Sequence, residues 1–438
     1  MENSCKVDER MIPKKAREKA GTAVKLIERY SGLDAAYFLK GGAYTTTSNV
    51  ITGLLSIAIA MVFANFSTPE LFGEYKYFIS IATMIGILGL SGFNVATIRS
   101  VAKGFEHSVK EATLVRLKFS ALVSILLFGI SGYFYFVLGD PLWKIIAIFA
   151  AFFPFQYSFN TINSLFVGRM RFDLSSLFNV VVRFAVVLSV SIAVILFNDL
   201  TACIVAYLAA TGISACAAYW ISIKRMKLND NREEGLVRYG IHLTVTDAVW
   251  TISQNIDKVI IAHFLGYVEV AIFSIAQIVP NEVRYLTGMI RNLALPKMSE
   301  SKNKNLWGSI RKKLVATTSV LTLGVLMITI LLPYLVPFLF GSSYIESVFY
   351  AQILMLWCIP FYPIQVIIAF LQSKQEVKEL YGFRIYSAFV KITLLLGLTF
   401  QYGLLGVVGA YLITDFLGAV YLWWRASGLE KKPAGASG

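Results

Sequence analysis

Long apolar stretches recur along this sequence and restrict the folds that it can adopt. Hydrophobic side chains make up 57% of the 438 residues and charged ones only 15%, which is more apolar surface than a soluble domain can bury. A helix needs about 20 apolar residues to cross a bilayer of ~30 Å, and these stretches lack the alternation of a membrane barrel strand. We therefore predict an all-α polytopic membrane protein. Its twelve transmembrane helices are expected at residues 43–66, 75–98, 114–138, 142–166, 174–197, 200–223, 239–264, 267–290, 312–332, 345–371, 381–402 and 404–424.

A weak internal repeat relates the two halves of the chain. Sliding the sequence by 198 positions places Lys40-Gly41-Gly42 on Arg238-Tyr239-Gly240, and Asn49 on Asp247. The alignment holds at both ends and at the intervening turn, which two unrelated apolar segments seldom show. Because both halves begin on the same side of the membrane, the repeat is parallel. Two parallel six-helix bundles are a transporter layout, with the substrate site between them near the middle of the membrane.

Basic residues give the orientation and the boundaries. Of 40 lysines and arginines, 33 fall in the two tails and in alternate loops, so the positive-inside rule places both termini in the cytoplasm. The net charge of +14 then reflects topology, and we expect no nucleic-acid partner. The expected parts are an N-terminal tail (1–41), a bundle (42–223), a linker (224–237), a second bundle (238–424) and a C-terminal tail (425–438). The N-terminal tail is expected to be either an amphipathic helix on the membrane surface or a solvated segment.

The sequence gives no support for chemistry on a substrate. The four cysteines lack metal-ligand spacing, and neither a His-carboxylate pair nor a Gly-rich phosphate loop is present. The loops on the outer side are too short to house a catalytic domain. We therefore expect a transporter without enzymatic activity, metal or cofactor.

Four ionisable residues are expected at one depth in the membrane. At 1.5 Å per residue, Arg183, Lys391, Asp247 and Asp415 all fall about 12–15 Å from the inner ends of their helices. Charged groups at that depth are costly and mark substrate or ion paths by default. Arg183 and Lys391 lie on equivalent helices, so we expect them to face one another across a central cavity. The alternative is that Lys391–Asp415 and Arg183–Asp247 are structural ion pairs.

Further polar residues lie on the seventh and eighth predicted helices. On the seventh helix, Lys258 is expected either to end a polar stripe that faces water or to extend its side chain to the outer surface of the membrane. Asp257 is expected to pack against a neighbouring helix. Pro280 should bend the eighth helix, which leaves Glu282 and Arg284 at an inward-facing entrance. Arg99 is interpreted as a cation at the membrane edge, with binding of a lipid phosphate as the alternative.

The spacing of several short motifs resembles one family of transporters. In the second half these motifs are Arg238-Tyr239-Gly240, Asn255 to Ile261 and Phe264-Leu265-Gly266, and the first half has Phe72 to Tyr75 and Gly89 to Gly92. They resemble the Wzx-type polysaccharide flippases of the MATE-like (MOP) superfamily. The resemblance covers about residues 40–424 in layout.

This resemblance implies a bacterial inner-membrane protein that moves an undecaprenyl-pyrophosphate-linked oligosaccharide between leaflets by alternating access, with proton coupling as one option. The implied partners are the lipid-linked glycan, membrane lipids and polysaccharide assembly proteins. A cationic cavity would accept the anionic head group, although Lys258 stands where the family often has Arg. The candidate substrate-binding residues are Arg183, Lys391, Lys258, Arg284, Arg99 and Asn49, and the candidate coupling or ion-pair residues are Asp247, Asp415, Glu282 and Asp257.

Three other functions are considered. A multidrug or ion-coupled exporter of the same superfamily would favour an acidic, aromatic cavity, whereas the polar layer here carries as many cations as acids. A lipid II flippase typically has fourteen spans. A membrane polysaccharide polymerase or ligase typically has a large outer loop, and none is predicted here.

Overall fold

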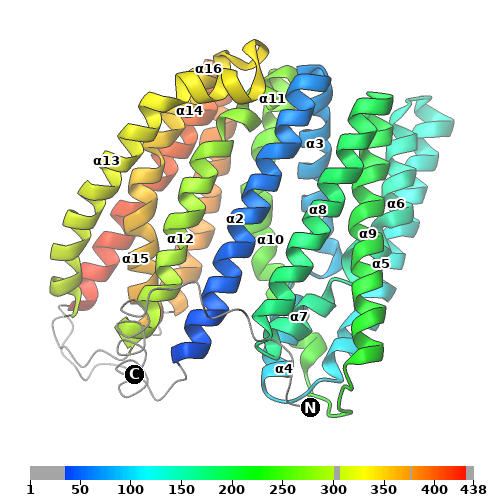
Figure 1. Ribbon diagram of the computed structural model, residues 1–438, viewed down its shortest axis with the longest axis horizontal. Coiled ribbons are helices and arrows are strands. Elements are labelled where there is room, and N and C mark those ends of the chain that lie inside the picture. The colour runs from blue at the N-terminus through cyan, green and yellow to red at the C-terminus, as the bar shows by residue number, and fades with distance from the viewer. Residues whose placement is uncertain (1–34, 300–305, 375–376, 431–438) are drawn as a thin grey trace, which may run out of the picture.

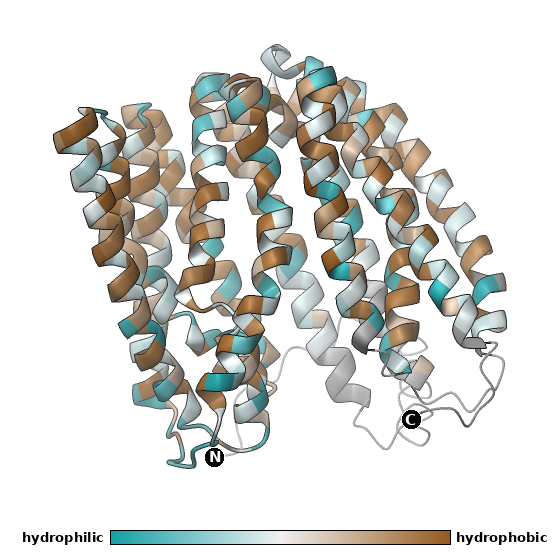
Figure 2. Ribbon diagram, turned by 180° about the vertical axis from the view of Figure 1, so that it is seen from behind, coloured by the Kyte–Doolittle hydropathy of each residue, from teal (hydrophilic) through white to brown (hydrophobic). Residues whose placement is uncertain are grey.

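The computed structural model describes residues 35–299, 306–374 and 377–430. These residues form a bundle of long helices and contain no strand (Figure 1). The first described helix starts, and the last one ends, at the same end of the bundle. Hydrophobic residues predominate along the outer helices, and hydrophilic residues gather in the loops at the lower end (Figure 2). The prediction of an all-α polytopic membrane protein is confirmed, and the prediction for residues 1–34 lies outside the described residues.

The first half of the bundle extends to the hydrophilic linker. Its elements are α2 (Ala35–Phe66), α3 (Pro69–Ile85), the 3-10 turn η2 (Gly86–Gly89), α4 (Phe93–Ala102), α5 (Ser108–Tyr133), the π-helical turn η3 (Phe134–Leu138), α6 (Leu142–Ser158), α7 (Thr161–Gly168), α8 (Phe172–Phe197) and α9 (Leu200–Arg225).

The second half begins after the linker. Its elements are α10 (Leu236–Phe264), α11 (Tyr267–Ala276), α12 (Ile278–Ser299), α13 (Leu306–Phe340), the short turn η4 (Ser342–Tyr344), α14 (Glu346–Leu356), α15 (Cys358–Ser373) and α16 (Val377–Glu430).

Nine segments of the described chain are long and apolar enough to cross a membrane. The segment Glu379–Gly428 counts as one of them, although Gly403 breaks α16 with φ 58° and ψ −137°, at the predicted boundary between the last two spans. The long helix α10 is not among the nine; it carries the polar stripe that includes Asp257 and Lys258. The count of twelve helices and the cytoplasmic placement of the termini stay predictions.

Two helices of the second half end shortly before proline residues, whereas α6 of the first half continues through one. Proline cannot donate a backbone hydrogen bond, and its ring clashes with the carbonyl group four residues earlier. Helix α11 ends at Ala276, four residues before Pro280, and α14 ends at Leu356, four residues before Pro360. In the first half, Pro154 lies inside α6. The carbonyl oxygen that it leaves free, that of Ala150, accepts a hydrogen bond of 2.7 Å from Ser124 Oγ on α5, so the helix continues.

The two halves share one hydrophobic core and touch closely at two glycines. The largest cluster of buried residues draws on α2, α3 and α8 of the first half and on α10, α11 and α14 of the second. A Cβ atom on Gly73 of α3 would lie 2.6 Å from the carbonyl carbon of Tyr267, and one on Gly92 would lie 2.7 Å from the carbonyl oxygen of Gly240. Only glycine therefore fits at these crossings of α3 with α11 and of α4 with α10.

Candidate functional site

A cavity of about 450 Å³ lies within the second half, between α10, α12, α15 and α16. Its walls carry three kinds of polar or flat side chain: cations, aromatic rings, and amides. The cations are Arg284, Arg384 and Lys391, the aromatic residues include Trp250, Trp357, Phe361 and Tyr381, and the amides are Gln254, Gln365 and Gln372. Asp415 is the one carboxylate among the residues that line it.

Lys391 is the most deeply buried cation of this cavity. The residue is only 4% exposed, and its Nζ lies 4.2 Å from the centre of the Tyr411 ring. Within the described residues it makes neither a hydrogen bond nor an ion pair. A buried ammonium group that no carboxylate contacts is costly. The cation–π contact with Tyr411 and the electrostatic attraction of Asp257 and Asp415 offset part of that cost. Lys391 therefore offers an unused positive charge to a ligand in the cavity.

Arg284 is fixed in place by aromatic rings and by an acid. Its guanidinium carbon lies 3.1 Å from the centre of the Trp357 ring and 4.0 Å from that of Phe361. Its Nη1 lies 3.1 Å from Oδ2 of Asp415, and the two side chains are 14% and 18% exposed. Stacking on two rings restrains the flat guanidinium plane, so its position does not depend on Asp415 alone.

The expected ion pairs differ from those in the structure. Asp415 pairs with Arg284 of α12 rather than with Lys391, and Asp247 lies 3.6 Å from Arg384 of α16 rather than beside Arg183. The prediction used depth in the membrane alone, and depth does not specify which helices are neighbours. The Arg384–Asp247 pair is the more exposed of the two, with side chains 48% and 37% exposed.

A second polar group lies beside the cavity, where α10 meets α16. Asp257 is completely buried. Its Oδ2 accepts a 2.6 Å hydrogen bond from the Tyr411 hydroxyl and lies 3.1 Å from Nζ of Lys258, with which it forms an ion pair. Lys258 also donates to Gln277 at 3.3 Å. Asp257 thus packs against a neighbouring helix as expected, and Lys258 turns inward rather than towards the outer surface.

Arg183 lies apart from the cavity, contrary to the expectation that it faces Lys391. Its Nη2 donates a 2.6 Å hydrogen bond to Ser56 on α2, and it is not among the residues that line the cavity. Glu282 of α12 packs against Gly53, also on α2, and is close enough to Arg183 to attract it electrostatically. Arg183 and Glu282 therefore approach one another across the two halves of the bundle.

The two remaining candidates lie at the periphery. Arg99 is exposed on α4, and its guanidinium carbon stands 4.8 Å from the centre of the Tyr239 ring. Asn49 is half-buried on α2. Neither lines the cavity, so the structure groups Lys391, Arg284 and Asp415 and leaves Arg99, Asn49 and Arg183 outside that group.

Three important cations were not singled out from the sequence. Arg384 lines the cavity, although it lies near the start of the helix predicted at 381–402. Lys76 of α3 has its Nζ 5.2 Å from the centre of the Phe72 ring and lies within electrostatic range of Arg183. Arg116 is 2% exposed on α5 and donates hydrogen bonds to Gly89 O and Asn94 Oδ1 at 2.9 and 2.6 Å. The only signal for Arg116 was its place just inside an apolar stretch.

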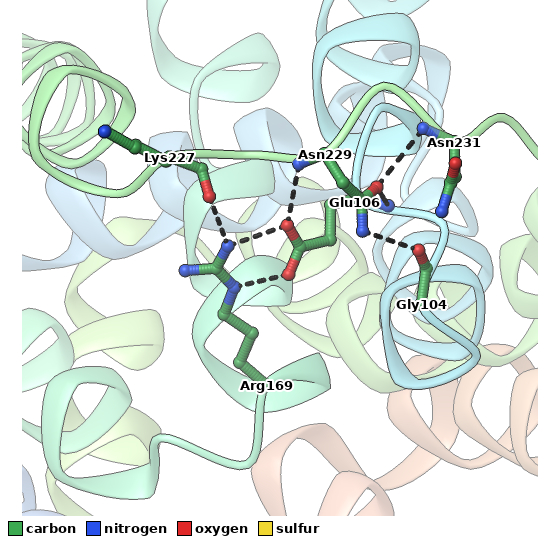
Figure 3. A network of polar contacts seen from close by, with 6 residues as sticks. All are labelled: Gly104, Glu106, Arg169, Lys227, Asn229 and Asn231. Carbon is green, nitrogen blue, oxygen red and sulfur yellow. Dashed lines mark hydrogen bonds and ion pairs between the residues drawn. The ribbon is translucent and has the colours of Figure 1, made fainter.

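Polar contacts fasten the linker to the first half (Figure 3). Arg169, at the end of α7, donates two hydrogen bonds of 2.7 Å to Glu106 in the α4–α5 loop, and the backbone N–H of Asn229 donates a third at 3.0 Å. The hydrogen bonds from Arg169 hold the pKa of Glu106 below its ordinary value of 4.5. Glu233 near the end of the linker pairs with Lys103 at 2.8 Å and accepts a hydrogen bond from Ser100.

Comparison with known proteins agrees with this architecture. A family model described as polysaccharide biosynthesis protein matches residues 38–302. A multidrug resistance MATE family transporter in its inward-facing conformation superposes with a TM-score of 0.69 at 14% identity, over 90% of this chain and 100% of that one. The lipid II flippase MurJ, inward closed, gives 0.71 at 14% identity, over 89% and 87%.

A third solved structure is a MOP superfamily transporter from Pyrococcus furiosus, described as having a binding pocket of reverse polarity that suggests a different function. It superposes with a TM-score of 0.60 at 13% identity, over 90% of this chain and 96% of that one. No curated protein sequence matches this chain. The likeness to these structures establishes the fold, and the family model covers more than half of the residues. The chain therefore belongs to the polysaccharide biosynthesis protein family and has the membrane-transporter fold of the MOP superfamily.

Proposed function

We propose that this protein is a flippase that moves a diphosphate-linked, lipid-anchored oligosaccharide across the bacterial inner membrane by alternating access. The observation that carries the proposal is Lys391, a buried cation that lines a cavity and makes neither an ion pair nor a hydrogen bond among the described residues, although Asp257 and Asp415 lie within electrostatic range of it. Family membership adds a role in polysaccharide assembly, where glycan units are built on an anionic lipid carrier. The same proposal includes polysaccharide assembly proteins as partners.

The cavity suits the head group of such a substrate. Lys391 would donate a charge-assisted hydrogen bond to a phosphate oxygen. Arg284, which its two aromatic neighbours hold in position, would donate a second. A volume of about 450 Å³ is typical of a small-ligand site. It would hold the phosphates and the nearest sugar, while the rest of the glycan and the prenyl chain extend outside. Sugar rings commonly stack on flat aromatic side chains, which Trp250 and Tyr381 supply here.

An exporter of cationic drugs is the alternative within the same fold. Three cations and one acid line this cavity, and a cationic drug would be repelled there. The Pyrococcus furiosus transporter is likewise described as having reversed pocket polarity, so the fold is compatible with such a change. We also propose that protonation of Asp247 or Asp415 drives the return step, because both acids pair with arginines at the cavity.

Complementation of a bacterial strain that lacks its polysaccharide flippase tests the proposal. Surface polymer and accumulated lipid-linked precursor are both measured, for the unaltered protein and for Lys391→Ala. A hydrogen bond to a charged group contributes about 1.5–3 kcal/mol, so the variant should bind its substrate roughly 10- to 150-fold more weakly and lose surface polymer while precursor accumulates.

The matched control is Lys144→Ala, which removes an exposed lysine and should restore polymer as well as the unaltered protein does. Both proteins are compared at equal membrane abundance. Full activity of Lys391→Ala would refute the assignment of the site. No rescue with any glycan type, together with resistance to cationic drugs on overexpression, would support the exporter instead.

A further inference from the structure

Two aspartate–arginine pairs flank the cavity, and they differ in burial. The Arg284–Asp415 pair is at 3.1 Å with side chains 14% and 18% exposed, whereas the Arg384–Asp247 pair is at 3.6 Å with side chains 48% and 37% exposed. Exposed ion pairs contribute little because water screens them. A buried pair holds its partners far more strongly, since separating them leaves each charge without compensation.

Arg284 keeps its position independently of Asp415. The stacking on Trp357 and Phe361 fixes the guanidinium plane, and no other carboxylate lines the cavity. An anion that enters therefore finds two buried cations: Lys391, which has no ion pair, and Arg284, whose partner is Asp415. The third cation of the lining, Arg384, is more exposed and pairs with Asp247. An anion that binds Arg284 therefore competes with the Asp415 carboxylate for the guanidinium group.

Resting on the flippase function proposed above, we infer that Asp415 is a resident counter-ion, which occupies Arg284 in the empty cavity and is displaced by the anionic group of the substrate. Asp415 thereby lowers the affinity of the cavity for every anion. Small anions such as phosphate gain too few contacts to displace it. A diphosphate that also binds Lys391 gains a second cation, because Lys391 and Arg284 lie on neighbouring rings, Tyr411 and Trp357, whose centres are 4.7 Å apart.

Binding of inorganic pyrophosphate to the purified full chain in neutral-lipid nanodiscs tests this inference by titration calorimetry. Asp415→Asn keeps the shape of the side chain but removes the competing charge, so it should bind pyrophosphate at least roughly tenfold more tightly than the unaltered protein. Asp415→Glu keeps the charge and should stay close to the unaltered affinity. The matched control, Asp173→Asn, removes the acid of an exposed pair with Arg171 that does not line the cavity, and it should change affinity by less than about threefold.

Thermal melting of each variant shows whether it is folded, and added pyrophosphate should raise the melting temperature of Asp415→Asn more than that of the unaltered protein. If folded Asp415→Asn binds pyrophosphate no more tightly, while binding to the unaltered protein depends on Lys391, the counter-ion role is wrong and the flippase site stands. If no variant binds pyrophosphate, or Lys391→Ala does not weaken binding, both the inference and the proposed site fail.

Discussion

Replacement of Gly92 by alanine should separate α4 from α10. The methyl group would lie 2.6 Å from the carbonyl carbon of Leu243 and 2.7 Å from the carbonyl oxygen of Gly240. Ordinary contact begins at 3.4 Å, and these neighbours are backbone atoms that cannot rotate away. Gly92 has φ −63°, which alanine adopts easily, so the clash is the only source of strain.

The expected cost has two parts. Overpacking of a close contact costs about 1–3 kcal/mol. The Gly92 N–H also donates a 3.1 Å hydrogen bond to Thr244 Oγ1, and such bonds contribute about 0.5–1.5 kcal/mol. The contact between the two halves should thus weaken by roughly 2–4 kcal/mol. Each 1.4 kcal/mol corresponds to about a tenfold change in an opening equilibrium.

Hydrogen–deuterium exchange of the first turns of α10 measures this opening. Gly92→Ala should speed exchange around Gly240 and Thr244 by roughly tenfold or more. The control is Gly129→Ala, because a methyl group there meets no atom within 4 Å and removes a flexible residue from the interior of α5. Equal exchange in the two variants would refute the argument that the glycine crossing holds the halves together.

Two further predictions concern the linker and the last helix. Glu106→Gln should weaken the attachment of the linker to the first half by roughly 1–2 kcal/mol, since it removes the charge that pairs with Arg169. Trypsin should then cleave faster between residues 224 and 235, whereas the control Glu111→Gln should be cleaved at the unaltered rate. Because the pKa of Glu106 is depressed, its contribution is present above pH 4.5 and is lost as the pH falls through the lower folded-state pKa. In the unaltered protein, exchange of the linker amides, corrected for intrinsic rates, should therefore rise only below about pH 4.5. Gly403→Ala should destabilise α16 by roughly 1–3 kcal/mol and lower the melting temperature, because alanine is strained at φ 58° and ψ −137°. The control Gly397→Ala, where a methyl group meets no atom within 4 Å, should not lower the melting temperature.

The sequence predicted the helices well because a single physical signal, the length of an apolar stretch, determines them. It predicted the turn at Gly403 and a bend near Pro280 for the same kind of local reason. The break of the second span at Gly86–Gly89, held by Arg116, was not predicted, since apolar residues continue through it. The hydrogen bond that stabilises this break comes from Arg116, which lies 27 residues further along the chain than Gly89 and so gives no local signal.

The candidate site was predicted in part. Lys391, Arg284 and Asp415 were named and lie together around one cavity, since charges deep in the membrane are rare and informative. The expectation that Arg183 faces Lys391 was wrong, and so were the two ion pairs given as the alternative, because depth does not specify which helices are neighbours. Arg384 was overlooked for the same reason: only the packing of α16 against α10 brings it to Asp247.

If the cavity changes sides of the membrane as proposed, the charges around it would make transport sensitive to the membrane voltage. Arg284, Arg384 and Lys391 carry three positive charges, and Asp415 and Asp247 carry two negative ones, which leaves one positive charge when no ligand is bound. Moving one elementary charge across the membrane is worth about 2.3 kcal/mol per 100 mV. In a carrier that turns this cavity from one side to the other, a cell interior held negative would draw the empty cavity back towards the cytoplasm. An anionic cargo would reverse the sign of the loaded cavity, so the same voltage would favour the outward step with cargo and the inward step without it.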